Sequence, residues 1–385
     1  MNIKELLAVH QAAGTQAAAQ IFQAPGRVNL LGEHTDYSGG FCMPVAINFG
    51  TLVAASPRSD NIVRIYSVDF GATIECDLGA LPSDARGHWS AYFIGVIWSL
   101  QEDGIPIHGA DLTVTGNVPR GAGLSSSASV EVATATALLG LSGIALPGAH
   151  LARLCQRAEN DYVGAPCGIM DQFVSACGRE GNALVLDTRS LEYTLAPFPP
   201  TLRLVICNSM VKHSTEEAYA TRRREVEEGT RVLASYRPAI ASLRDVTMED
   251  LNNCRRSLPE NVFRRCRHII TDSQRVLDGL SYLEAGEIAE FGRLMNEAHT
   301  SYWEDFEASC LECDLLVTLA QREAGCYGAR LTGGGFGGCT VNLVEEAYSD
   351  RFVENMKRSY REMTSVDPDI YICRITAGAG QLQGY

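Results

Sequence analysis

The chain has 385 residues, with 32 Lys and Arg against 46 Asp and Glu, so its formal net charge is −14. Such an acidic chain has no overall attraction for nucleic acids or anionic membranes, and we expect neither as a partner. Hydrophobic residues make up 46% and charged residues 20% of the chain, which excludes a disordered or fibrous protein and is typical of a globular protein of about two domains.

Cysteine usage and the N-terminal segment bear on the compartment. The 13 cysteines are odd in number and irregularly spaced, which is unlike a disulfide scaffold and favours a reducing cytosol. Residues 1–7 contain an early Glu and lack the apolar stretch of a signal peptide, and the uncharged stretch 132–151 is broken by glycines and a proline. We therefore expect a cytoplasmic protein without a transmembrane segment. Cys310 and Cys313 form a CxxC that lacks the second pair of a zinc site, so we interpret them as two helical cysteines, with a redox or metal role as the minor alternative.

The first half of the chain predicts a mixture of strands and helices. Short apolar runs between turn residues indicate strands, whereas longer runs with helical period indicate helices. We expect strands over residues 28–31, 41–47, 51–55, 61–66, 72–78, 110–115 and 183–186, and helices over 1–7, 89–101, 127–139 and 148–163.

The second half predicts a helical middle and a return to strands. We expect a strand over 202–208, mainly helices from 216 to about 324, and strands over 328–331, 339–344 and 370–375. This order indicates an α+β fold in two domains, 1–195 and 196–385. The boundary is placed near residues 193–200, where three prolines cluster.

The segment 24–37 gathers hydrogen-bonding side chains among short apolar residues. It contains a guanidinium, two carboxylates and an imidazole, from Arg27, Glu33, His34 and Asp36. Such groups present many hydrogen bonds to a polyhydroxylated ligand. A charged turn between strands explains the same residues equally well, and a metal site on them lacks a partner motif.

A loop rich in glycine and serine lies between a predicted strand and a predicted helix. Its central residues are Gly121, Ala122, Gly123, Leu124, Ser125, Ser126, Ser127 and Ala128. Glycines let the backbone approach an anion, a helix N-terminus offers free N–H groups, and serine hydroxyls add donors or a magnesium ligand. The loop has neither the Walker A sequence nor the Rossmann spacing. We favour phosphate binding over the alternative, a glycine turn with a serine N-cap.

Two further segments depart from ordinary patterns. Five glycines occupy the six positions 333–338, at a cost in backbone entropy that local stability does not explain. This loop is expected to adopt unusual dihedral angles or to lie against a ligand or another backbone. Asp171 follows the tight turn 164–168, where a carboxylate either serves a site or begins a helix.

Taken in this order, the segments resemble the GHMP small-molecule kinases and, within them, the galactokinase branch. Residues 26–37, GRVNLLGEHTDY, are similar to the signature of that branch, of which mevalonate and homoserine kinases keep only fragments. Residues 121–129, GAGLSSSAS, resemble the phosphate loop of the family, and residues 331–338, LTGGGFGG, resemble its third motif. The segments 168–172 and 219–223 also match, so the resemblance runs from about residue 20 to the C-terminus.

The resemblance implies a fold and a reaction. The fold would have an N-terminal α+β domain and a ferredoxin-like C-terminal domain, with the active site in the cleft between them. The reaction would move the γ-phosphoryl group of ATP to the C1 hydroxyl of α-D-galactose, giving galactose 1-phosphate and ADP. Mg²⁺ would be the cofactor and ATP the co-substrate, and we expect a monomer.

The resemblance also assigns roles to residues of this chain. The catalytic residues would be Asp171, which accepts the proton of the attacking hydroxyl, and Arg27 beside it. The sugar would be bound by Glu33, His34, Asp36, the Gly168 backbone, Asp171 and Tyr219. The phosphates of ATP would lie on residues 121–128, and Trp89 and Tyr92 are candidates for the adenine pocket, although aromatic residues at helical spacing are more often core. Magnesium would be held by Ser126 and Glu159.

Three other functions compete with this one. A related kinase of the same family would phosphorylate N-acetylgalactosamine or another monosaccharide with the same motifs. A sensor would bind galactose and ATP without phosphoryl transfer, but such proteins tend to lose serine-loop residues, which are intact here. A scaffold role gives no reason for three glycine-rich loops.

Overall fold

The computed structural model describes residues 1–13, 18–119, 121–211 and 216–384. A first sheet has the strand order β13-β1-β3-β6-β4-β5. Its strands are β1 (Gln20–Asn29), β3 (Pro44–Pro57), β4 (Ile62–Ser67), β5 (Ala72–Asp77), β6 (Ala110–Gly116) and β13 (Gly380–Leu382). β4 and β6 pair in parallel, whereas β1 and β3, β3 and β6, and β4 and β5 pair antiparallel.

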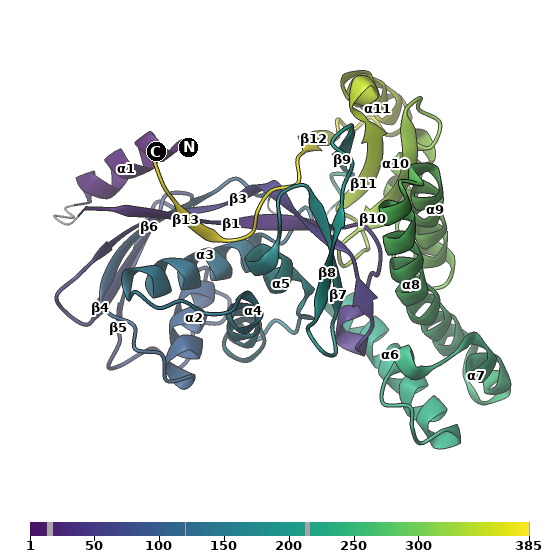
Figure 1. Cartoon of the computed structure of the whole chain (residues 1–385), viewed down its shortest axis with the longest axis horizontal. Helices are drawn as coiled ribbons and strands as arrows, with labels where there is room; N and C mark the ends of the chain where they lie inside the picture. Colours follow the sequence, from purple (N-terminus) through teal and green to yellow (C-terminus); the bar gives the residue numbers. More distant parts are fainter. Residues whose placement is uncertain (14–17, 120, 212–215, 385) are drawn as a thin grey trace.

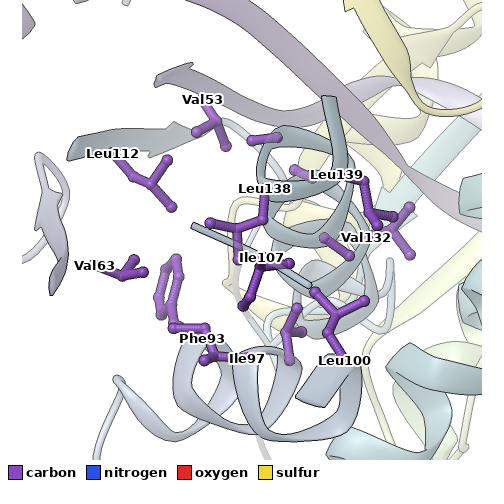
Figure 2. Packing of buried hydrophobic residues seen from close by; sticks show 14 of the residues in the cluster. Val53, Val63, Phe93, Ile97, Leu100, Ile107, Leu112, Val132, Leu138 and Leu139 are labelled. Carbon is purple, nitrogen blue, oxygen red and sulfur yellow. The ribbon is translucent and has the colours of Figure 1, made fainter. Parts of the chain in front are cut away.

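Helices cover both faces of this sheet (Figure 1). One face carries α2 (Ala91–Glu102), α3 (Ser126–Leu141), α4 (Gly148–Arg157) and α5 (Met170–Cys177), and the other carries α1 (Ile3–Ala12). Successive side chains of a strand point to opposite faces of the sheet, so Phe22 packs toward α3 while its neighbour Ile21 packs toward α1. Figure 2 shows Val53 and Leu112 of the sheet facing Leu138 of α3 in this core.

A second, antiparallel sheet has the order β10-β11-β9-β12. Its strands are β9 (Leu202–Asn208), β10 (Cys326–Thr332), β11 (Cys339–Glu345) and β12 (Asp369–Cys373). Helices α10 (Leu311–Ala320) and α11 (Ser349–Thr364) pack on one face. Beside it stand α6 (Glu216–Tyr236), α7 (Met248–Asn253), α8 (Glu260–Ala285) and α9 (Ile288–Glu304) (Figure 1). Leu204 and Ile206 of β9 share a core with Val28 of β1, so the two halves are packed together.

Most predicted elements are confirmed, and some segments differ in extent or helix type. The region 193–200, predicted as a boundary, contains β8 (Tyr193–Pro197), which pairs with β7 (Asn182–Asp187), and β7 pairs in turn with β2 (Phe41–Cys42). The strands predicted over 41–47 and 51–55 are largely one long strand, β3. The predicted helix 148–163 is α-helical as far as Arg157 and continues as a π-helical turn over Ala158–Val163. No described helix is long and apolar enough to cross a bilayer.

Candidate active site

A bulge in β1 brings the first motif against the glycine- and serine-rich loop. The register between β1 and β3 shifts between Pro25 and Arg27. A Cβ on Gly26 would lie 2.6 Å from the Leu124 carbonyl oxygen, closer than any side chain tolerates. The backbone N–H of Arg27 donates to the same oxygen at 3.1 Å. Glycine at position 26 therefore allows the contact that places Arg27 beside the loop.

The two predicted catalytic residues form a bidentate ion pair. Arg27 Nε and Nη2 donate to the two carboxylate oxygens of Asp171, each at 2.7 Å. The Ser125 hydroxyl donates to Asp171 as well, and Arg27 Nη1 donates to the Gly123 carbonyl. Arg27 is 7% exposed and Asp171 is 25% exposed, so the carboxylate faces open space while the guanidinium is held behind it. This arrangement fixes a carboxylate at the start of α5, next to the loop.

The Asp36 carboxylate lies directly against the backbone of Gly168. The Asp36 carboxylate accepts hydrogen bonds from the backbone N–H groups of Tyr37, at 3.0 Å, and of Met170. A Cβ on Gly168 would lie 1.6 Å from Asp36 Oδ2, so any side chain at position 168 would displace the Asp36 carboxylate. The turn before α5 thus approaches the first motif closely enough for a backbone and a carboxylate to act on one ligand.

Asp36 is partly buried among other carboxylates. Burial, followed by the neighbouring carboxylates of Asp171 and Glu33, raises the pKa of Asp36 to about 6. A cavity of about 330 Å³ borders Asp36 and Gly168 and also reaches Arg223 of α6. A ligand hydroxyl in this region could donate to the Asp36 carboxylate beside its two backbone donors.

We predict that Asp36→Asn stabilises the protein at neutral pH. A folded pKa above the ordinary value means that the native state binds more protons than the unfolded state between about pH 4 and 6, so the carboxylate costs stability as pH rises through this window. The variant should raise Tm by about 2–4 °C at pH 7.5 and by less at pH 5, by calorimetry. Asp60→Asn is the opposite-sign control, because hydrogen bonding to Arg58 lowers the pKa of Asp60 to about 2. A gain in Tm that is equal at both pH values would contradict the prediction.

His34 lies in an aromatic cluster and is neutral. Its Nε2 is 3.0 Å from the Tyr302 hydroxyl, which itself donates to the Gly333 carbonyl, and 3.3 Å from the Gly334 carbonyl. These partners accept, so the network assigns the ring proton to Nε2 and leaves Nδ1 to accept from the Tyr37 hydroxyl at 2.8 Å. Burial lowers the pKa of His34 to about 3. The ring of Tyr219 lies 5.0 Å from that of His34, which brings α6 to the first motif.

Glu33 joins the first motif to the third glycine loop. Its Oε1 accepts from the Gly333 N–H at 3.0 Å and the Thr332 hydroxyl at 3.2 Å, and it lies 3.7 Å from Arg330 Nη2. Burial raises the pKa of Glu33, against the opposing charge of Arg330. Asp272 of α8 accepts from the Glu33 N–H at 2.8 Å. Sequence analysis missed Asp272 and Arg330, because single polar residues in a helix and a strand form no motif.

The third glycine loop adopts unusual dihedral angles and also lies against other backbone, two of the alternatives predicted. A Cβ on Gly335 would lie 2.3 Å from the Ala308 carbonyl oxygen, and one on Gly333 would lie 3.1 Å from the Gly123 carbonyl oxygen. Both glycines have positive φ, 85° and 90°. The second and third motifs, far apart in sequence, are therefore neighbours at one site.

The π-helical turn carries Glu159 into a buried polar cluster. Gln172 Nε2 donates to Glu159 at 2.5 Å and to Glu131 at 3.1 Å, and the Ser127 hydroxyl also bonds to Glu159. Burial, followed by the charge of Asp171, raises the pKa of Glu159. A carboxylate beside serine hydroxyls, with excess negative charge, fits a hard divalent cation. The described residues contain no group of three or more His, Cys, Asp or Glu that would hold a metal alone, so such an ion would need further oxygen ligands.

The remaining candidate residues lie in the loop before the N-terminus of α3 and just before α2. Gly121 and Gly123 have positive φ, 68° and 73°, and both are exposed, whereas Ala122, Leu124 and Ala128 are buried. Trp89 lies outside this loop and stacks on Phe70, with ring centroids 5.2 Å apart. These facts leave the backbone of the loop open to a ligand.

Known proteins share this architecture and these motifs. The galactokinase galactose-binding signature matches residues 10–57, the N-terminal domain of GHMP kinases matches residues 91–179, and their C-terminal domain matches residues 280–362. The chain is 45% identical to a galactokinase of Roseiflexus sp. (strain RS-1), over 94% of this chain and 93% of the relative. The chain belongs to the galactokinase family of GHMP kinases.

Other members of the family and of the wider fold agree with this placement. A galactokinase of Chloroflexus aggregans is 43% identical over 94% of this chain and 92% of the relative. The crystal structure of Lactococcus lactis galactokinase complexed with galactose superposes with a TM-score of 0.93 at 34% identity, covering 98% of this chain and 99% of that one. A mevalonate kinase structure, at 19% identity and a TM-score of 0.64, covers 93% of this chain and 99% of that one and shares the fold. The α+β GHMP fold predicted from the sequence is confirmed.

Proposed function

We propose that this member of the galactokinase family phosphorylates the C1 hydroxyl of α-D-galactose with ATP, giving galactose 1-phosphate and ADP. The observation that carries the proposal is the bidentate Arg27–Asp171 pair, set between the phosphate loop and the Asp36–Gly168 contact. A carboxylate, a cation and a phosphate-binding loop in contact are the parts that phosphoryl transfer requires.

Asp171 would act on the attacking hydroxyl. Its oxygens are fixed by three donors from Arg27 and Ser125, so it can orient the C1 hydroxyl and finally accept its proton. Because the transition state of phosphoryl transfer is loose, orientation contributes more than early proton abstraction. Arg27 would offset the negative charge between carboxylate and phosphoryl group.

The remaining hydroxyls of the sugar would bind the first motif. Asp36 and the Gly168 backbone offer acceptors and donors in contact with each other, while Glu33, His34 and Tyr219 would complete the pocket. A site whose polar groups match particular hydroxyls discriminates strongly against an epimer, because its own groups would be left unpaired.

The phosphates of ATP would lie on residues 121–128 at the N-terminus of α3. Free backbone N–H groups and the positive end of the helix dipole favour an anion there. Mg²⁺, when bound, neutralises phosphate charge, and we propose Glu159 and Ser126 as its protein ligands, with the hydroxyl of Ser127 already on Glu159. Trp89 and Tyr92 are proposed to contact the adenine. Because Phe70 stacks on one face of the Trp89 ring, at most the other face of Trp89 is open to the base.

Compartment, assembly and domain division are part of the same proposal. We propose a cytoplasmic enzyme, supported by the 13 cysteines, all of which lie in the described parts of the chain and are free thiols. We propose a monomer, in which the Arg27–Asp171 pair and the Asp36–Gly168 contact form within one chain. The proposal of two domains is supported by the separate sheets, whereas its boundary at residues 195 and 196 falls inside β8, and β13 returns to the first sheet.

Coupled ADP release with ATP and Mg²⁺ tests the function. We expect strong release with galactose, and kcat/KM for glucose lower by about 10⁴-fold, because the epimer leaves buried polar groups unpaired. Reactions with N-acetylgalactosamine and without sugar are the controls. Release with N-acetylgalactosamine alone would move the substrate within the family. Binding of ATP and galactose without release would favour a sensor.

A further inference from the structure

The CxxC is placed as an asymmetric pair of thiols at the start of a helix. Cys310 is the N-cap residue of α10, and Cys313 lies one turn into the helix. Cys310 is half-buried, whereas Cys313 is fully buried. Leu311, which follows Cys310 in the chain, is 83% exposed, so the Cys310 thiol borders the open surface. One thiol can therefore meet a reagent from solution, and the other can meet only the first thiol.

The two cysteines lie three residues apart at the start of one helix, so their thiols are neighbours. The Cys313 thiol hydrogen-bonds to Cys310, and this bond is the main cause that lowers the pKa of Cys310. For the other twelve cysteines of the chain the pKa is raised, chiefly by burial except at Cys313, where the thiol bond is the main cause. Access and a position at a helix N-terminus both favour thiol reactivity, and Cys310 is the accessible member of the pair at the N-cap of α10.

We propose that Cys310 and Cys313 form a thiol–disulfide exchange site that takes low-molecular-weight disulfides. The Cys310 thiolate attacks one sulfur of a disulfide such as oxidised glutathione; a bond to Cys310 forms, the reagent's S–S bond breaks, and one glutathione thiolate leaves. Cys313 then loses its proton to solvent and attacks the Cys310 sulfur, which releases the second glutathione. In total two protein thiols are oxidised and one disulfide is reduced to two thiols.

The segment that leads into this pair supports the candidate active site. The Ala308 carbonyl accepts from the Phe336 N–H at 2.7 Å, which ties the segment to the third glycine loop. The Phe306 carbonyl accepts from Arg222 Nε at 2.7 Å, and Arg222 lies on α6 one turn after Tyr219. A covalent bond at Cys310 would change the end of a segment that holds both the loop and α6. We therefore expect oxidation to lower kcat/KM for galactose, a consequence that rests on the proposed function.

Mass spectrometry of the folded full-length protein in glutathione redox buffers tests the site. We expect an internal Cys310–Cys313 disulfide, formed about tenfold or more faster than modification of Cys326, which is also half-buried but has a pKa raised to about 12. Cys313→Ser should stop at one glutathione on Cys310, and Cys310→Ser should form neither product. Failure of the internal disulfide to form, or equal rates at Cys310 and Cys326, would overturn the proposal.

Activity provides the second readout. Kcat/KM of the oxidised protein should be at least about threefold lower than that of the reduced protein and should recover with dithiothreitol. Cys326→Ser, the matched control, should respond as wild type does. A disulfide that leaves kcat/KM unchanged would overturn the link to the active site. A reduced protein inactive with every sugar would instead count against the proposed function, while the mass spectrum would still decide the exchange site.

Discussion

Replacing Asp171 by asparagine is expected to lower kcat by about 10²–10⁴-fold with galactose and ATP, the range usual for loss of a general base. Asparagine has the same shape, but its NH₂ group cannot accept a hydrogen bond. One of the donors that face this position, from Arg27 or Ser125, would then point at another donor. Coupled ADP release gives kcat and KM, and circular dichroism checks the fold.

The same variant removes the partner of a buried cation, so lost stability must be separated from lost chemistry. Asp111 on β6 is the matched control, because its carboxylate accepts from Arg58 at 2.9 Å and Arg64 at 2.8 Å, beneath α1. Asp111→Asn should lower Tm and leave kcat unchanged. A kcat near wild type in folded Asp171→Asn would contradict the proposed role, and an equal loss in both variants would indicate a general defect of folding.

Local patterns predict the elements well because local and tertiary requirements agree in most of them. In β9, Leu204 and Ile206 face one core while Val205 and Cys207 face another, so the strand is a continuous apolar run that its length and flanking turns identify. The failures depend on tertiary contacts. β13 has three residues and pairs with β1 more than 350 positions away, for which no local signal exists.

The π-helical turn is a second case of this kind. The apolar period of residues 148–163 predicts a continuous helix, yet the regular hydrogen-bond pattern ends after Arg157. The turn places Glu159 where Gln172 and Ser127 bond to it. Such turns often occur at functional sites, and the bonds that accompany this one come from residues distant in sequence.

The candidate site is predictable where a residue belongs to a motif and obscure where it acts through another residue. Arg27 and Asp171 are 144 positions apart, and their pairing was expected from the family resemblance rather than from spacing. Asp272 holds the backbone N–H of Glu33 from the middle of α8, and Arg330 lies beside the Glu33 carboxylate from β10. Both appear in the sequence as ordinary charged residues, because their function depends on a contact that only folding creates.

Replacing Gly168 by alanine is expected to lower kcat/KM for galactose by about 10²-fold or more, the cost of an atomic-scale misplacement in an active site. The added methyl carbon would lie 1.6 Å from Asp36 Oδ2 and 2.1 Å from its Cγ, so the carboxylate must move away. The backbone at position 168 is not in the left-handed region, and the effect is therefore steric contact rather than backbone strain. KM for ATP should change little, since the phosphate loop is not displaced.

Two further variants separate this contact from general effects of an added methyl group. A Cβ on Gly380 meets no atom within 4 Å, so Gly380→Ala should behave as wild type in the same assay. If Asp36 transmits the damage, then Gly168→Ala combined with Asp36→Ala should be no worse than Asp36→Ala alone, because the clash has lost its target. Additive losses in the double variant would show that the methyl group acts elsewhere, and full activity in Gly168→Ala would show that the Asp36 carboxylate does not need its present position. The added methyl group thus tests whether galactose recognition depends on the close contact between the Gly168 turn and the Asp36 carboxylate.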